Sequence, residues 1–393
     1  MKKNLSLSAD QVSEAYAKMQ MNMISRSRAR KGIALFCILL LSAFLLLLGS
    51  LFFILPEKAF SEKENRMLTS KSVLSARGVF FDGLPEKLSA LISDQFPMRD
   101  AFVGIESYLS LAFTGKANNV KLRDGSLSKE ILPDAKALDN LDSSLDAVKT
   151  VKSLLDIESH FLCVPLPCRA YQNRRGNDTK YASLEDKLTN ADCFDFARSV
   201  ENKDGIFYKT DHHLNADGTY LLYLFLCKQL NVEPKTDFKQ ICVSRDFYGT
   251  AWSQSGLWDF GADSIYVHAY EGDNTYKLSG DIESDSMYFP DKLKTKDKYA
   301  YFLGGNYGYL EIKSVNEEKR QSLLIIKDSY ANSLVPLLAR HFDITLIDPR
   351  YFNGDVLEVA KNCSKCLFLF GVSSLMTDVG LVELSFNAGN GRQ

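Results

Sequence analysis

The longest apolar stretch of the chain lies near its amino terminus. Gly32–Leu55 reads GIALFCILLLSAFLLLLGSLFFIL and contains no charged residue. A helix needs roughly 20 apolar residues to cross a bilayer, and this stretch is too long for the core of a signal peptide. Four basic residues precede it: Arg26, Arg28, Arg30 and Lys31. Because basic residues mark the cytoplasmic side, we predict a cytoplasmic tail at 1–31 and a single membrane helix at 32–55. A cleaved export signal is the alternative, and it gives the same location for the rest of the chain.

Beyond Pro56 the chain is expected outside the cytoplasm, anchored to the cytoplasmic membrane. Residues 57–75 are charged and carry no apolar period, so we place a stalk at 56–80. A globular domain is expected at 81–393. It begins with two segments of helical apolar spacing, Leu84–Ile92 and Ala101–Phe113.

Short apolar strands then alternate with helical segments. The strands are expected at Phe161–Pro165, Ile206–Tyr208, Leu323–Lys327, Ile344–Ile347 and Cys366–Phe370. The helices are expected at Ala216–Leu230 with Asn215 as cap, at Leu334–Phe342 with Ser333 as cap, and at Val356–Asn362. This alternation predicts an α/β fold with a doubly wound, mostly parallel sheet flanked by helices.

Charge and cysteine content narrow the function classes. The 47 basic and 49 acidic residues nearly balance, so no nucleic-acid partner is expected. Seven cysteines follow the apolar stretch: Cys163, Cys168, Cys193, Cys227, Cys242, Cys363 and Cys366. An odd number cannot pair completely, and several stand in apolar runs as small core residues do. Cys363 and Cys366 have metal-type spacing but no second pair, so no zinc site is expected.

A serine follows the strand predicted at Leu323–Lys327. Ser329 stands two residues past the strand and just before a helix, where backbone N–H groups can stabilise a developing oxyanion. A serine nucleophile needs a histidine base that is held by an acid. The plainer interpretation is that Asp328 or Ser329 only caps a helix.

Asp211-His212-His213 supplies an acid and two imidazoles at a strand-to-helix junction. In an extended segment, residues two apart point the same way. Asp211 can therefore hold one ring nitrogen of His213 and leave the other facing the serine, whereas His212 points away and acts as a supporting group. The same three residue types also bind metals in phosphoesterases, but no Asp-x-Asp block precedes them and the chain is expected outside the cytoplasm.

Several blocks together resemble the bacterial DHHW family, within the wider group of SGNH-like proteins that includes alginate O-acetylation proteins. The blocks are Ser61–Leu68 with its Glu-Asn-Arg, Asp94–Asp100, Tyr208–His213, Asp246–Thr250, Gly304–Asn306, Ile326–Ser333 and Asp348–Phe352. The sequence departs from the family at Leu214, where tryptophan is usual, and at Asn215, where threonine is. We expect the departure at Leu214 to change the wall of the site near the base.

The resemblance implies an SGNH-like fold and a triad of Asp211, His213 and Ser329. Supporting and oxyanion-binding groups are expected among these residues: Tyr330, Asn306, Gly305, Arg350, His212 and Asp328. The expected activity is transfer of an acyl group, most simply acetyl, to a cell-surface or secreted polysaccharide, with a multi-pass membrane O-acyltransferase as the partner that delivers it. No cofactor and no metal are expected. A polysaccharide acetyl-esterase with the same triad, or a non-catalytic glycan-binding or assembly component, is the alternative.

Overall fold

The structure is a computed structural model that describes residues 9–390 except 62, 65, 75–83, 130, 168–180, 194–195, 201–202, 204, 271–274 and 317–319. Several predictions therefore fall outside the described residues. They concern Cys168, two residues of the block Ser61–Leu68 (Glu62 and Asn65), and the first residues of the domain predicted at 81–393. The chain forms two compact units, residues 1–61 with 66–102, and residues 62–65 with 103–393.

The first unit contains the long apolar helix. Its elements are α1 (Ala9–Ile54), β1 (Phe60–Ser61), β2 (Arg66–Met67), η1 (Lys71–Leu74) and α3 (Leu84–Gln95). Within α1, Arg30–Ile54 is long and apolar enough to cross a membrane. The region predicted as a stalk contains a short hairpin and is joined to α3: the Asp94 carboxylate accepts a hydrogen bond from Arg66 at 2.5 Å and one from the Thr69 N–H at 2.9 Å. Two family blocks thus meet at Arg66 and Asp94.

The second unit contains a six-stranded sheet of order β6-β13-β11-β12-β10-β9. Its strands are β6 (Glu158–Val164), β9 (Tyr276–Gly280), β10 (Tyr309–Ser314), β11 (Gln321–Lys327), β12 (Phe342–Ile347) and β13 (Lys365–Gly371). β6, β13, β11 and β12 are parallel, and β10 and β9 continue the sheet antiparallel. The mostly parallel α/β fold is therefore confirmed.

Helices and two smaller sheets complete this unit. The helices and turns are α4 (Arg99–Thr114, across the unit boundary), α5 (Ala135–Leu154), α7 (Ala182–Asn190), α8 (Phe196–Ser199), α9 (Ala216–Leu230), α10 (Thr250–Ser255), η4 (Pro290–Lys294), η5 (Lys298–Tyr301), η6 (Ser329–Ala331), α11 (Val335–Leu338), α12 (Val356–Ala360), α13 (Val372–Thr377) and α14 (Gly380–Asn390). The smaller sheets are β3 (Lys116–Ala117), β4 (Val120–Arg123) and β5 (Ser126–Lys129), and β7 (Lys239–Phe247) with β8 (Asp263–Ala269).

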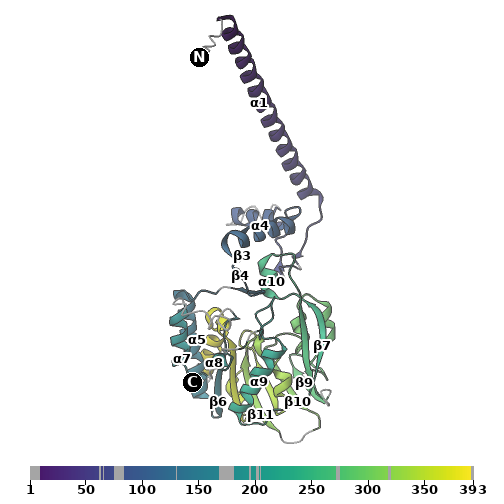
Figure 1. The fold of residues 1–393 in the computed structure, drawn as a ribbon. Coiled ribbons are helices and arrows are strands. Elements are labelled where there is room, and N and C mark those ends of the chain that lie inside the picture. Colours follow the sequence, from purple (N-terminus) through teal and green to yellow (C-terminus); the bar gives the residue numbers. More distant parts are fainter. Residues whose placement is uncertain are drawn as a thin grey trace, which may run out of the picture. The chain divides into compact units, whose positions relative to one another are not determined.

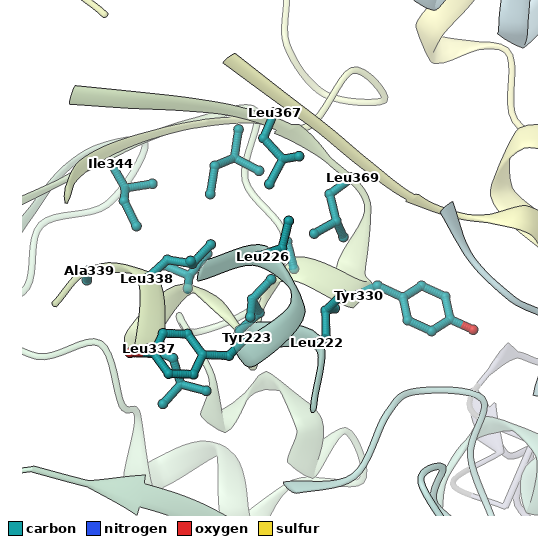
Figure 2. Close-up of a cluster of buried hydrophobic side chains, with 14 of the residues drawn as sticks. Leu222, Tyr223, Leu226, Tyr330, Leu337, Leu338, Ala339, Ile344, Leu367 and Leu369 are labelled. Atoms are coloured by element: carbon teal, nitrogen blue, oxygen red, sulfur yellow. The ribbon is translucent and has the colours of Figure 1, made fainter. Parts of the chain in front are cut away.

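β11 is buried on both faces, as expected for a central parallel strand. Leu323 and Ile325 pack in the cluster that contains α9, which lies over one face of the sheet (Figure 1). Leu324 and Ile326 pack in the opposite cluster with residues of α5, α13 and α14. Figure 2 shows the first cluster, in which side chains of α9 and α11 meet Leu367 and Leu369 of β13.

The strand order places a topological switch point at β11. The chain continues from β11 to β12 on one side, and β13 then pairs with the opposite side of β11. Ligands of open parallel sheets bind at the carboxyl ends of strands beside such a point. Ser329 stands two residues past this end of β11.

Two predicted elements are wrong. The helix predicted at Leu334–Phe342 is too long. Only Val335–Leu338 is helical, as α11, and Phe342 already belongs to β12, where it pairs with Gln321. Ser333 does not cap it; its hydroxyl is 3.0 Å from that of Thr219. The strand predicted at Ile206–Tyr208 is a single bridge between Phe207 and Leu214, because the chain reverses between them.

Four cysteines are buried, as predicted for small core residues. Cys163, Cys227, Cys363 and Cys366 are at most 8% exposed, and burial raises the pKa of the Cys363 and Cys366 thiols. They act as small core residues.

Candidate active site

The Asp-His-His segment is the tip of a tight hairpin. The backbone N–H of Tyr208 donates to the carbonyl of His213 at 3.1 Å, and that of Asn215 donates to Ile206 at 3.0 Å. Phe207 and Leu214, paired between these bonds, are each 2% exposed. The core therefore holds both ends of the loop.

Leu214 lies in this core with residues of α9, not on the wall of the site. At 2% exposure, leucine itself adds no accessible surface beside the base, and the effect of losing the tryptophan ring stays a prediction. Asn215 caps α9 as predicted, accepting from the Gly218 N–H at 3.0 Å.

Asp211 and His213 are joined as predicted. His213 Nδ1 lies 2.5 Å from Asp211 Oδ1, and the His213 backbone N–H donates to the same oxygen at 3.0 Å. The segment between them is bent rather than extended, so loop closure rather than strand alternation brings the two side chains together.

Thr250 holds the other oxygen of the Asp211 carboxylate. Asp211 Oδ2 accepts from the Thr250 N–H at 2.7 Å and from its hydroxyl at 3.0 Å. Burial favours a higher pKa for the Asp211 carboxyl, but the adjacent His212 and His213 imidazoles and these hydrogen bonds outweigh it. The pKa lies well below its usual range, so Asp211 is ionised.

Asp263 fixes the residues that precede Asp211. Its two oxygens accept from the Lys209 N–H at 2.9 Å and from the Thr210 N–H at 2.7 Å. Thr210 is fully buried and also donates its hydroxyl to Asp263 at 2.6 Å. β8, which starts at Asp263, thus sets the conformation of the loop.

Ser329 opens the turn η6 and lies against His213. Its Oγ is 2.8 Å from His213 Nε2, across 116 residues of sequence. The carboxylate at Nδ1 can only accept, so Nδ1 carries the proton and Nε2 is free to accept the Ser329 hydroxyl proton. This chain of hydrogen bonds is the arrangement that activates a serine.

Aromatic rings surround His213. The Tyr299 ring stacks on it, with centroids 3.9 Å apart and an angle of 14°, and the Tyr299 hydroxyl donates to Ser333 Oγ at 3.1 Å. On another side the His212 centroid lies 4.0 Å away. The imidazole therefore has little freedom to rotate.

Tyr330 ties the serine turn to the histidine loop. Its hydroxyl points away from the apolar cluster in Figure 2 and donates to the carbonyl of His212 at 2.9 Å. The Tyr330 backbone N–H donates to Asp328 Oδ1 at 2.9 Å. Asp328 is a cap, as the plainer interpretation predicted, and its other oxygen accepts from the Gly371 N–H at 2.7 Å.

Asn306 lies beside the same turn. Its Oδ1 accepts from Lys327 Nζ and from Asn332 Nδ2, both at 3.1 Å. Gly305 precedes it with φ of +133°, a conformation that favours glycine, and its carbonyl accepts from Asn332 at 3.3 Å. Because these two bonds occupy the amide oxygen, the amide N–H groups of Asn306 point away from Lys327 and Asn332.

Lys327 is buried at the end of β11. It is 2% exposed, donates to Asn332 Oδ1 at 2.9 Å and lies 3.5 Å from Asp348 Oδ2. Burial lowers the pKa of Lys327, and the Asp348 carboxylate opposes that change. The lysine anchors Asn306 and Asn332 around the serine turn.

Arg350 pairs with Asp348 rather than with the serine or histidine. Its Nε and Nη2 atoms donate to the two Asp348 oxygens at 2.8 and 2.6 Å, which raises the pKa of Arg350. Arg350 therefore forms an ion pair with Asp348, the carboxylate that also lies near Lys327.

The sequence reasoning missed several residues that shape this site. They are Gly249, Thr250, Asp263, Tyr299, Lys327, Asn332 and Asp348. The blocks that resemble the DHHW family were the available signal for five of them, because Asp246–Thr250, Ile326–Ser333 and Asp348–Phe352 contain all but Asp263 and Tyr299. Spacing alone gave these five no role. Thr250 and Asp263 meet the Asp211 loop only through the fold.

A loop-borne Asp-His pair facing a serine at a sheet switch point defines an α/β protein with the parts of a nucleophilic site. The model of the DHHW protein family matches residues 169–347, which include all three residues. The predicted resemblance to this family is therefore confirmed. No curated protein matches the chain.

Solved structures share the fold. A DHHW family protein from Eubacterium siraeum is 21% identical with a TM-score of 0.55, covering 68% of this chain and 96% of its own. Bacillus cereus PatB1 is 19% identical with a TM-score of 0.54, covering 66% and 98%. PatB1 with a sulfonyl adduct is 18% identical with a TM-score of 0.52, covering 67% and 97%.

Proposed function

We propose that the protein transfers acyl groups, most simply acetyl, to a polysaccharide by way of Ser329. The observation that carries the proposal is the hydrogen-bonded series from Asp211 through His213 to Ser329, with distances of 2.5 and 2.8 Å. The choice of an acyl group and a polysaccharide is supported by the resemblance of the sequence blocks to alginate O-acetylation proteins.

In the first half-reaction, Ser329 Oγ attacks the acyl carbonyl carbon while its proton passes to His213 Nε2. The donor oxygen leaves with that proton, and an acyl-serine remains. In the second half-reaction, an acceptor hydroxyl attacks the acyl carbon, its proton passes to His213, and the serine oxygen takes it back as the new ester leaves. Ionised Asp211 stabilises the imidazolium in both halves.

The oxyanion needs hydrogen-bond donors near Ser329. The Tyr330 N–H is engaged with Asp328, so it does not serve in this role. The Ser329 N–H, at the first position of a helical turn, and the Asn306 amide, whose oxygen is held by Lys327, are the donors we assign. Gly305 supplies the backbone conformation that places Asn306.

The proposed location is the outer side of the cytoplasmic membrane. The apolar part of α1, preceded by basic residues, would anchor the chain with its amino terminus inside. Because acyl-CoA is absent outside the cytoplasm, a multi-pass membrane O-acyltransferase would supply the acyl group.

The test uses the full-length chain in detergent and an activated acetyl ester. We expect Ser329→Ala to lose turnover by at least about a thousandfold, whereas Ser153→Ala on the exposed side of α5 keeps it. A sulfonyl fluoride should label the wild type on Ser329 and leave Ser329→Ala unlabelled. Equal turnover in wild type and Ser329→Ala would show that the nucleophile is assigned wrongly.

The products separate the alternatives. With an added oligosaccharide, acetylated sugar indicates transfer and acetate alone indicates an esterase. Absence of Ser329-dependent turnover indicates a glycan-binding or assembly component.

A metal site is the second candidate, because ligand atoms of Asp211, His212 and His213 lie within 4.8 Å of one another. Both His213 nitrogens, however, already face Asp211 and Ser329. Turnover that a chelator abolishes and a divalent metal restores would favour this alternative.

A further inference from the structure

His212 is the exposed member of the Asp-His-His segment. Its side chain is 37% exposed, while the Asp211 side chain is 2% and the His213 side chain 7% exposed. Its Nδ1 lies 2.8 Å from Thr250 Oγ1.

The hydrogen bonds around Thr250 settle which nitrogen of His212 carries the proton. A carboxylate only accepts, so the Thr250 hydroxyl gives its single proton to Asp211 Oδ2. The Thr250 oxygen must then accept from His212, which makes Nδ1 the protonated nitrogen. Above the ordinary histidine pKa of about 6.5, the ring carries this proton alone.

The other nitrogen, Nε2, is therefore an acceptor. No described residue donates a hydrogen bond to His212 Nε2. This nitrogen is also absent from the fully buried side-chain atoms that lack a hydrogen-bond partner. It consequently reaches solvent. A fixed acceptor atom thus stands on a ring whose centroid is 4.0 Å from that of His213.

We propose that His212 Nε2 binds a second hydroxyl of the acceptor, next to the hydroxyl that is acylated. This inference rests on the proposed function. The reacting hydroxyl must place its proton at His213 Nε2, and the neighbouring hydroxyl of a vicinal diol then meets His212. Sugar rings carry such adjacent hydroxyls, whereas water does not, so His212 favours transfer to sugars over hydrolysis.

The proposed hydrogen bond transfers no proton to His212. The acceptor gives one proton to His213, as in the second half-reaction, and forms one ester bond to the acyl carbon. His212 is a binding residue that orients the acceptor. One well-placed hydrogen bond corresponds to about a tenfold preference.

The test compares cyclohexane-1,2-diol with cyclohexanol as acceptors for the full-length chain in detergent, with an activated acetyl ester as donor. The wild type should acetylate the diol about tenfold faster than the monohydric alcohol. His212→Asn retains an amide donor near the Nδ1 position and removes the outward acceptor. It should lose the preference, which is measured as the ratio of diol to monohydric alcohol acetylated, so that a change in the rate common to both alcohols cancels.

His212→Gln separates binding from structure. Its amide oxygen reaches the position of Nε2, so part of the diol preference should return. A purely structural role predicts the reverse, because only asparagine can still donate to Thr250. His160→Asn, a remote change beside Glu158, is the control and should behave as the wild type.

Each other outcome overturns the inference. These outcomes are a diol preference unchanged in His212→Asn, parallel loss of transfer and hydrolysis in both variants, and hydrolysis alone with either alcohol. In all three, Ser329-dependent turnover persists and the proposed nucleophile stands. Turnover that does not depend on Ser329 overturns the proposed function as well.

Discussion

Gly249 offers a test of how closely Asp211 must be held. A Cβ atom added at this position would lie 2.2 Å from Asp211 Cβ and 2.3 Å from Asp211 Oδ2. The Gly249 φ of −84° suits alanine, so Gly249→Ala introduces a collision without backbone strain. The collision falls on the carboxylate that orients His213.

The size of the effect follows from these distances. An ordinary contact begins at 3.4 Å, so the carboxylate must move by about 1 Å, and such misplacement of a catalytic group costs about a hundredfold in rate. That loss corresponds to about 2.7 kcal/mol of transition-state stabilisation. Overpacking should also lower the free energy of unfolding by about 1–3 kcal/mol.

The assay is kcat/KM on an activated acetyl ester, together with thermal unfolding of the full-length chain in detergent. Gly261→Ala is the matched control, because an added Cβ there meets nothing within 4 Å. Gly249→Ala should lose most activity at temperatures where it remains folded. If its kcat/KM equalled that of Gly261→Ala, the close approach to Asp211 would have no part in catalysis.

Two further predictions concern stability. Lys327→Met leaves the Asn306 and Asn332 amide oxygens without their lysine donor and should lower the free energy of unfolding by about 1–3 kcal/mol in a urea titration. Lys294→Met at the exposed pair with Asp291 should change it little, and equal effects of the two substitutions would contradict the role of the buried lysine. The hydrogen bond from Arg66 lowers the pKa of Asp94 from its ordinary value of 3.8 to about 2. Ionised Asp94 therefore stabilises the fold fully above pH 3.8, and this contribution is lost as the pH falls from 3.8 through 2. Asp94→Asn should therefore remove part of the acid dependence of unfolding in this range, and an unchanged pH profile would refute the assignment.

The sequence predicted the central elements of the fold because their signals are local. β11 and β13 are continuous apolar runs, and α9 begins after Asn215, which caps it as expected. The helix expected at Leu334–Phe342 failed for a nonlocal reason. Apolar spacing there serves both α11 and the start of β12, and only pairing with Gln321 decides where the strand begins.

For the candidate site, the sequence predicted the residues that carry the chemistry and missed those that position them. Asp211 and His213 are two residues apart, so a short-range argument joined them. Thr250 binds Asp211 across 39 residues and Asp263 binds Thr210 across 53. No rule of sequence spacing predicts such pairs. Thr250 and Asp263 reach the Asp211 loop only because β7 and β8 fold next to it.

The fold divides stability and positioning between different residues of one short loop. Phe207 and Leu214 face the core and hold the loop ends, while Asp211 faces the Gly249-Thr250 segment and His213 faces Ser329. Position 214 therefore requires an apolar side chain rather than a reactive one. Leu214 meets this requirement, and the hydrogen bonds of Asp211, His213 and Ser329 are made without a tryptophan beside the base.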